Sequence, residues 1–470
     1  MEKRKPWTVL VYIAADDEVL SKHVRASLNQ MLQGRIDGEA HIIAQVDAPK
    51  VKTKRYSLSG SGSLNRHIVG TPVQNINAGS PRQLKSFLKW GIQGYPADHY
   101  AIIVWGHGTG LDDPTFWQAS DLGMSKSPSR AVEKFGMELT PIAPGLQRPG
   151  VARNVLLNAA APNSRFHRQT ASNPSLRLAT LIPSVQLRKV DRQLRRFAQI
   201  AIDGKHYISN PQLRKALEAA QRLAKGRVAV FGTDACVMSM VELCYEFRCV
   251  PLMIASEAGI PLQSWPYRRI LHRLKKDPAM SPRSLATTIV NEFAGYYDGT
   301  RSDTTLSAFN LKQPKSLKKA IDKLAAQLTI AMGKPDSRAE IFSSRQAAQG
   351  FENVVDYVDL YDFCRLLRRR KSSVLLRRAC TEVMKAIKGI VLRSKHSGNA
   401  YARAYGLSIY FPRWLLATKG RSKSNVLEMK KVEKAISGRY AELQFAKQTK
   451  WDEFLRRAVQ TTQVALPVPA

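Results

Sequence analysis

Short apolar stretches alternate with amphipathic ones along the first half of the chain. Five apolar stretches have the length and composition of buried strands: TVLVYIAA (8–15), HIIAQVD (41–47), HYAIIVWG (99–106), VAVFGTDA (228–235) and PLMIASE (251–257). Between them, apolar residues recur at helical spacing over 18–33, 81–93 and 210–226, and Asn210 is the expected N-cap of the last helix. This order predicts an α/β fold, a mostly parallel sheet with helices on both faces.

The last third of the chain has mainly helical patterns. They predict helices over 281–297, 314–332, 336–349, 356–370 and 373–394, and one strand, YGLSIYF (405–411). We therefore expect an α/β domain over 1–300 and a mainly helical region over 301–470 that contributes one strand.

The regular pattern stops between about 111 and 194. This stretch is rich in Pro, Ser, Asn and Ala, and its basic residues outnumber its acidic ones. Its composition predicts a basic, flexible insertion in the α/β domain, of the kind that is usually functional or disordered.

Composition is that of a soluble globular protein, with 44% hydrophobic and 23% charged residues. No apolar run is long enough to span a membrane. The apolar stretch near the N-terminus is short and runs into Asp16 and Asp17, so it is interpreted as a strand and not as a signal peptide, which predicts a cytoplasmic location. The five cysteines include no CxxC pair, so we expect neither a disulfide framework nor a structural metal site.

The net charge of +36 changes this picture, because so basic a surface attracts polyanions such as nucleic acid, anionic lipid or acidic proteins. The densest basic segment is CRLLRRRKSSVLLRRAC (364–380). The alternative is that the charge only solvates the surface.

Candidate chemistry lies at the ends of two predicted strands. HYAIIVWG delivers His107, and VAVFGTDA delivers Cys236. Neighbouring parallel strands bring such groups to one edge of a sheet, where histidine can serve as base for a thiol nucleophile and lower its pKa. The backbone amides of Gly108 and Cys236 could then form an oxyanion hole.

Several ordered motifs resemble those of the clostripain family of cysteine peptidases. They are the opening WTVLVYIAADD, the W-G-H-G box ending at Gly108, the segment DACVMSMVE around Cys236, ASEAGIPLQSWPY, and the later VDLYDF and YGLSIYFP. The resemblance runs from residue 7 to about 460, except for the 111–194 insertion.

The resemblance implies a caspase-like fold, a catalytic dyad of Cys236 and His107, and cleavage after Arg or Lys. It places an acidic residue two positions before the nucleophile, here Asp234, as the floor of the pocket for the basic side chain. Asp234 could instead be a strand-end cap that orients loop amides. Glu257 is either a second acidic wall or a loop-bracing carboxylate, and Trp265 lines the cleft or belongs to the core.

Family members are often zymogens that cut themselves between the catalytic His and Cys. Candidate cleavage points in the insertion are Arg148, Arg153, Arg165, Arg168 and Arg177, although the insertion could equally dock a partner. Some relatives use calcium, but there is no EF-hand pattern, so we expect no required cofactor and calcium is implied by resemblance only.

The sequence thus predicts a cysteine endopeptidase that acts on proteins or peptides with Arg or Lys before the scissile bond. The competing hypothesis is a basic, polyanion-binding or regulatory protein on a caspase-like scaffold.

Overall fold

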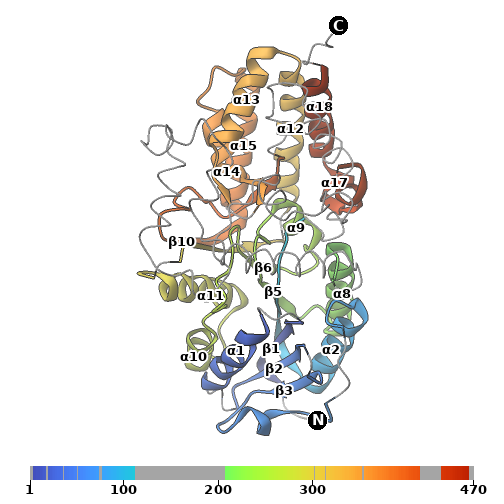
Figure 1. The fold of residues 1–470 in the computed structure, drawn as a ribbon, viewed down its shortest axis with the longest axis vertical. Helices are drawn as coiled ribbons and strands as arrows, with labels where there is room; N and C mark the ends of the chain where they lie inside the picture. Colours follow the sequence, from blue (N-terminus) through green and yellow to red (C-terminus); the bar gives the residue numbers. More distant parts are fainter. Residues whose placement is uncertain are drawn as a thin grey trace, which may run out of the picture. The chain divides into compact units, whose positions relative to one another are not determined.

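A mixed eight-stranded sheet, in the order β10-β7-β6-β5-β4-β1-β2-β3, organises the molecule (Figure 1). The structure is a computed structural model that describes residues 4–16, 20–34, 36, 38–49, 51–72, 77–111, 207–300, 302–312, 314–351, 354–412 and 436–464. The strands of the sheet are β1 (Lys5–Ala14), β2 (Ala40–Asp47), β3 (Lys54–Ser57), β4 (Ala97–Trp105), β5 (Val228–Asp234), β6 (Leu252–Ala255), β7 (Thr304–Asn310) and β10 (Val391–Ser397).

The five strands in the middle, β2, β1, β4, β5 and β6, run parallel. Antiparallel strands extend the sheet on both sides, β3 beside β2 and the pair β7 and β10 beside β6. The carboxyl ends of the parallel strands therefore meet at one edge, which is where such sheets place their chemistry.

Side chains alternate between the two faces along the strands, as the pleat requires. In β1, Leu10 and Tyr12 join one apolar core while Val9, Val11 and Ile13 join the other. Strands buried on both faces read as continuous apolar runs, which is why β1, β4 and β5 are visible in the sequence.

Each face of the sheet carries its own set of helices (Figure 1). Helices α1 (Ser21–Gln33), α10 (Tyr267–Lys276) and α11 (Pro282–Tyr297) contribute to the core of one face. Helices α2 (Pro81–Gly94), α8 (Asn210–Leu223) and α9 (Val241–Glu246) contribute to the core of the other. The predicted fold class, a mostly parallel sheet flanked by helices, is confirmed.

The C-terminal region continues the second of these cores. It contains α12 (Pro314–Met332), α13 (Pro335–Ala347), α14 (Leu360–Leu367), α15 (Val374–Ile390), α17 (Gln444–Gln448) and α18 (Trp451–Val464). A small sheet of β8 (Gly350–Phe351), β9 (Val354–Asp359) and β11 (Ser408–Tyr410) joins it to the loop after β5, where Ser408 N–H donates to the carbonyl of Ser239 at 3.0 Å.

Several sequence expectations for this region need correction. The expected helix over 356–370 begins as β9, and the one over 373–394 ends at Ile390 and continues as β10. Because β7 and β10 belong to the main sheet, residues 301–470 contribute more than one strand, and a boundary at 300 would cut through the sheet. Both strands carry many polar residues and lie at or next to an edge, so they lack the apolar signal of the central strands.

The N-cap of α8 is Ser209, one residue before the expected Asn210. Ser209 Oγ accepts from Gln212 N–H at 3.4 Å, and Gln212 Oε1 accepts from Ser209 N–H at 3.0 Å, which forms a reciprocal capping box. The expected insertion at 111–194 lies outside the described residues, apart from Leu111.

Candidate active site

The two candidate catalytic residues follow adjacent parallel strands at the same level of the sheet. Trp105 of β4 pairs with Asp234 of β5, and His107 and Cys236 each lie two residues beyond this pair. Gly106 N–H donates to the carbonyl of Asp234 at 3.3 Å, so the pairing continues past the ends of the strands. His107 is exposed and Cys236 is partly buried.

The backbones of the two loops touch at Gly108. A Cβ atom on this residue would lie 2.2 Å from the carbonyl oxygen of Cys236 and 2.9 Å from its nitrogen, closer than real Cβ atoms approach. Only glycine therefore fits, and the backbone amides of Gly108 and Cys236 lie in one small region. This proximity is what an oxyanion hole made of these two groups would need, although that role stays a prediction.

The chain turns sharply directly after Cys236. Val237 has a φ of 52°, in the left-handed region that a β-branched residue rarely adopts. Its N–H donates to the carbonyl of Ala258 at 3.1 Å, which holds the turn against the loop after β6. Strained backbone of this kind persists where surrounding contacts enforce it, and it is common at active sites.

The thiol of Cys236 lies beside the loop after β6, where Ile260 N–H donates to its Sγ at 3.3 Å. Burial raises the pKa of this thiol and the Asp234 carboxylate adds to the rise, while the N–H of Ile260 opposes it. The sequence suggested a pKa lowered by histidine; the structure shows the opposite direction, because loss of solvent outweighs the hydrogen bond.

Asp234 is buried beneath the segment that ends in SWPY. Its Oδ2 accepts hydrogen bonds from Ser264 Oγ, from Trp265 N–H at 3.2 Å and from Tyr267 Oη–H at 2.9 Å. Burial raises the pKa of this carboxyl to about 6, and the three donors oppose the rise. Its other oxygen, Oδ1, is buried with no hydrogen-bond partner among the described residues. The structure therefore places Asp234 as a cap on the loop and leaves one oxygen of the cap unused.

Ser264 anchors this loop through several contacts. It has a φ of 67°, its Oγ also accepts from Trp105 Nε1–H at 2.5 Å, and its carbonyl accepts from Tyr297 Oη–H at 2.7 Å. The serine and the tyrosine donors to Asp234 were not singled out from the sequence, although both lie in the motif ASEAGIPLQSWPY.

Trp265 and Glu257 are both buried. The Trp265 ring packs against Gly232 of β5, where a Cβ atom would lie 2.7 Å from it, so this side chain belongs to the core. Glu257 Oε2 accepts from Gly406 N–H at 2.9 Å. Both contacts correspond to the structural alternatives raised for these residues.

Glu257 also lies against a second buried carboxyl, Asp359. Burial, followed by the repulsion from Asp359, raises the pKa of Glu257 well above its usual value. Asp359 Oδ2 accepts from Tyr405 N–H at 2.6 Å, and burial raises its pKa to about 7. Two acids therefore hold consecutive backbone amides, those of Tyr405 and Gly406, and protonation of either acid would relieve their repulsion.

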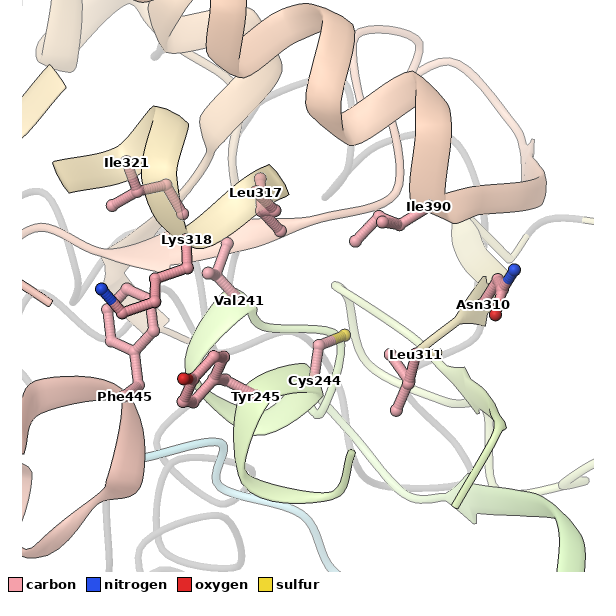
Figure 2. Close-up of a pocket in the computed structure, with 10 residues that line it drawn as sticks. All are labelled: Val241, Cys244, Tyr245, Asn310, Leu311, Leu317, Lys318, Ile321, Ile390 and Phe445. Atoms are coloured by element: carbon pink, nitrogen blue, oxygen red, sulfur yellow. The ribbon is translucent and has the colours of Figure 1, made fainter. Parts of the chain in front are cut away.

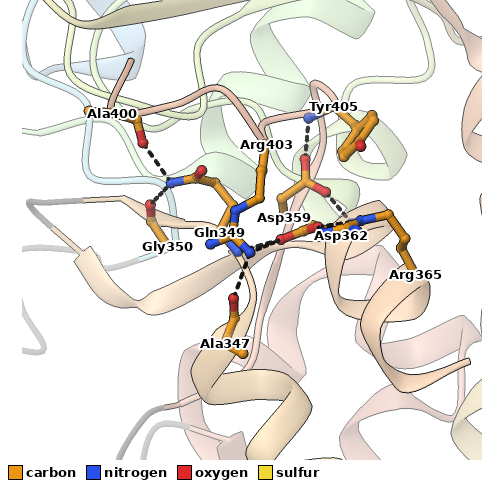
Figure 3. A network of polar contacts seen from close by, with 9 residues as sticks. All are labelled: Ala347, Gln349, Gly350, Asp359, Asp362, Arg365, Ala400, Arg403 and Tyr405. Atoms are coloured by element: carbon orange, nitrogen blue, oxygen red, sulfur yellow. Dashed lines mark hydrogen bonds and ion pairs between the residues drawn. The ribbon is translucent and has the colours of Figure 1, made fainter. Parts of the chain in front are cut away.

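Asp359 begins a wider polar network in the C-terminal region (Figure 3). It caps α14 by accepting from Asp362 N–H at 2.6 Å, and Asp362 forms ion pairs with Arg365 at 2.6 Å and Arg403 at 3.3 Å. Asp362 also accepts from Gln349 N–H at 2.9 Å. The motif VDLYDF thus braces the loop that carries Gly406.

Tyr357, directly before that motif, holds the segment that follows His107. Its hydroxyl donates to the carbonyl of Thr109 at 2.9 Å and accepts from Leu111 N–H at 2.7 Å. Asn210 Nδ2 donates to the carbonyl of Gly110 at 3.0 Å. Sequence reasoning did not single out Tyr357, and its partners lie more than two hundred residues away in the chain.

A small pocket lies between α9, the end of β7 and the helices α12, α15 and α17 (Figure 2). Its lining is mostly apolar and includes Cys244, whose thiol pKa is raised by burial. It offers no group suited to peptide cleavage. Within the described ranges no three His, Cys, Asp or Glu side chains gather as a metal ion would require, so calcium stays an implication of the resemblance.

None of the described helices combines the length and apolar character needed to cross a bilayer.

A model of the clostripain family of C11 peptidases matches residues 11–121 and 186–457, and the gap between them falls within the expected insertion. A search of curated proteins gave no match.

Three solved structures share the fold. An inactive zymogen C11 protease from Parabacteroides distasonis is 18% identical with a TM-score of 0.56, over 96% of this chain and 99% of that one. A secreted C11 cysteine protease from Bacteroides thetaiotaomicron, iotapain, is 13% identical with a TM-score of 0.56, over 95% and 99%. A secreted C11 protease of the same organism, bound to an irreversible peptide inhibitor, is 16% identical with a TM-score of 0.52, over 92% and 99%.

Glu242, six residues after Cys236, yields a test of the buried acids. Its Oε1 accepts from Tyr410 N–H at 3.0 Å and from Tyr440 Oη–H at 3.3 Å, and burial raises its pKa from 4.5 to about 7. Because the folded protein holds this proton more tightly than the unfolded chain, stability should fall as pH rises through that range. Glu242→Gln should remove up to about 3 kcal/mol of this loss.

The measurement is thermal unfolding of both proteins at about pH 4 and about pH 8, which lie on either side of the range over which the stability is lost. Glu382→Gln, which removes an exposed carboxylate from α15, should leave the pH dependence close to that of the wild type. An unchanged pH dependence in Glu242→Gln would show that Glu242 is charged throughout.

Proposed function

Since the chain belongs to the clostripain family and is therefore a cysteine peptidase, we propose that Cys236 is its nucleophile and His107 its general base. The observation that carries this proposal is the register of β4 and β5, which puts both residues two positions beyond the Trp105–Asp234 pair. Two chemically complementary groups at one sheet edge are what nucleophilic catalysis requires.

The reaction follows from these positions. The raised pKa keeps Cys236 a thiol at rest, so His107 must take its proton as Sγ attacks the substrate carbonyl carbon. The amides of Gly108 and Cys236 would hold the resulting oxyanion. His107 then gives the proton to the leaving amine as the peptide bond breaks and a thioester forms. Water, deprotonated by His107, then attacks the thioester carbonyl and forms a tetrahedral intermediate. Collapse of this intermediate releases the acid, and His107 returns the proton to the sulfur of Cys236.

For the primary pocket we propose cleavage after Arg or Lys, with Asp234 as the recognising acid. The unpartnered Oδ1 supports this, because a buried carboxylate oxygen without a donor is suited to a guanidinium or an ammonium. Entry of a basic side chain would also offset the desolvation that raises the pKa of Asp234. Glu257 is proposed as a brace and not as a pocket wall, since its Oε2 is bound to Gly406.

For activation we propose self-cleavage in the segment between His107 and Cys236. A cut there would leave β4 and β5 paired along their length, so the two fragments should stay associated. The bonds to the chain on either side, from Tyr357 to Thr109 and from Asn210 to Gly110, support this stability.

A cytoplasmic location is retained as a proposal from the sequence.

The dyad is tested by substitution. Cys236→Ala and His107→Ala should each lower the hydrolysis of short fluorogenic peptides by roughly three orders of magnitude or more, because each removes a group that forms or breaks bonds. Cys249→Ala is the matched control, since this cysteine is also partly buried but lies away from the site. Near wild-type turnover by either dyad variant would disprove the assignment.

Specificity is tested with peptides that carry Arg, Lys, Leu or Asp before the scissile bond. Asp234→Asn should lose on the order of 2–4 kcal/mol in kcat/KM for Arg and Lys substrates, because it leaves a buried cation unpaired. Glu257→Gln keeps an acceptor for Gly406 and should keep the preference for Arg and Lys. If Asp234→Asn cuts all four peptides as the wild type does, Asp234 is only a cap.

Self-cleavage is tested on ageing protein. Wild-type protein should convert into two associated fragments, with a new N-terminus after an Arg or Lys between 111 and 194, because a tethered site is presented at high effective concentration. Cys236→Ala protein should remain one chain. N-terminal sequencing identifies the cut, and an intact, fully active wild-type chain would exclude this mode of activation.

A further inference from the structure

The three large apolar side chains with the greatest exposure among the described residues lie in α12 and α15. Ile330 is 64% exposed, Leu375 59% and Val374 54%, whereas the next, Val51, is 48% exposed. Single exposed apolar residues are ordinary on protein surfaces, but a group of them marks an interaction site.

The packing of α12 against α15 places these three residues at the same level. Leu317 of α12 and Ile390 of α15 line one pocket (Figure 2), and Lys323 forms an ion pair with Glu382 at 2.8 Å. Residue numbers rise along α12 as they fall along α15, so the helices are antiparallel. Residue 331 of α12 and residue 374 of α15 each lie eight residues from the ion pair. Because the rise per residue is the same in both helices, the two residues lie at the same distance along the helix pair. Ile330 and Val374 therefore reach the same end of the helix pair.

This end is also strongly basic. Arg368, Arg369 and Lys371 are exposed in the turn between α14 and α15, and Arg378 is exposed one turn into α15. Within the described part of the chain, no ion pair uses any of these four cations. We name this surface the basic apolar end; it consists of Ile330, Arg368, Arg369, Lys371, Val374, Leu375 and Arg378.

The turn that presents these residues is well held. Arg370 contacts Glu340 at 3.4 Å and Ser343 Oγ at 3.2 Å, both in α13. Ser373 caps α15 by accepting from Leu376 N–H at 3.1 Å, and Leu376 itself is buried. The exposed aliphatic side chains are thus fixed outward by an ordered helix start, whose positive dipole end favours phosphate.

We propose that the basic apolar end binds the surface of anionic lipid membranes, with its cations among the headgroup phosphates and its aliphatic side chains at the acyl boundary. Peripheral segments that combine basic and protruding apolar residues bind in this way. This function is independent of peptide cleavage.

Charge and side-chain type favour lipid over other partners. A second copy of the chain would also carry a net charge of +36 and be repelled. Single-stranded nucleic acid is usually held by aromatic stacking, and the basic apolar end contains no aromatic residue. Aliphatic side chains, in contrast, gain free energy by leaving water for hydrocarbon.

The test is co-sedimentation of full-length Cys236→Ala protein with vesicles of phosphatidylcholine, alone or mixed with phosphatidylserine. We expect binding to the mixed vesicles only, weakened by salt. The triple variant Arg368→Gln, Arg369→Gln, Lys371→Gln should bind roughly a hundredfold less, at about fivefold per cation. Val374→Ser with Leu375→Ser should lower binding on the order of tenfold.

A matched control removes three exposed cations elsewhere, with Arg82→Gln, Lys85→Gln and Lys89→Gln in α2. Equal loss in this control would show a general charge effect and overturn the proposal, as would full binding by the Val374 and Leu375 variant. The proposal would also be overturned if a polynucleotide bound as tightly as the vesicles and its binding did not depend on Val374 and Leu375. It would likewise be overturned if the protein formed a dimer that Leu375→Ser abolished. Hydrolysis of soluble peptides by the otherwise wild-type variants should be unchanged, which separates this test from that of the proposed function.

Discussion

The pairing of β4 with β5 is the constraint on which the site depends. Five consecutive residue pairs from Ala101↔Val230 to Trp105↔Asp234 fix the relative height of two loops that are distant in sequence. Any slip of one residue would turn every side chain of a strand to the other face and bury polar groups in the wrong core. The apolar cores on both faces therefore enforce the same register that places His107 level with Cys236.

Buried carboxyl groups extend this order from the strands to the loops. Four of them each accept a hydrogen bond from a backbone N–H that donates to the carboxyl group in place of a carbonyl of a neighbouring strand. They are Asp234, Glu242, Glu257 and Asp359. Each removes an unsatisfied donor, but each is itself expensive to bury as a charge, which is why their pKa values rise. The loops around the nucleophile are thus tied to the C-terminal region by acids that are easily protonated.

Sequence patterns predict the central strands and the chemistry at their ends, because a strand buried on both faces must be apolar throughout. They fail at β10, where VLRSKHS is a half-exposed edge strand with no such requirement, and at β9, where they predict the start of a helix. Within the site, Cys236 and His107 stand out by local motif. The partners of Asp234 do not, since the roles of Ser264 and Tyr267 depend on how the loop folds back over β5.

The hydrogen bond between Asn210 and Gly110 has a consequence for how this protein can vary. It joins Gly110, just after β4, to Asn210, the first residue of α8, so the two ends of the long connection between these elements meet in a stem. The entropy of closing a loop grows slowly with its length, by about 0.6 kcal/mol for each doubling. The stem is therefore a natural insertion point, where segments of very different length or origin could be exchanged without disturbing the strands on either side.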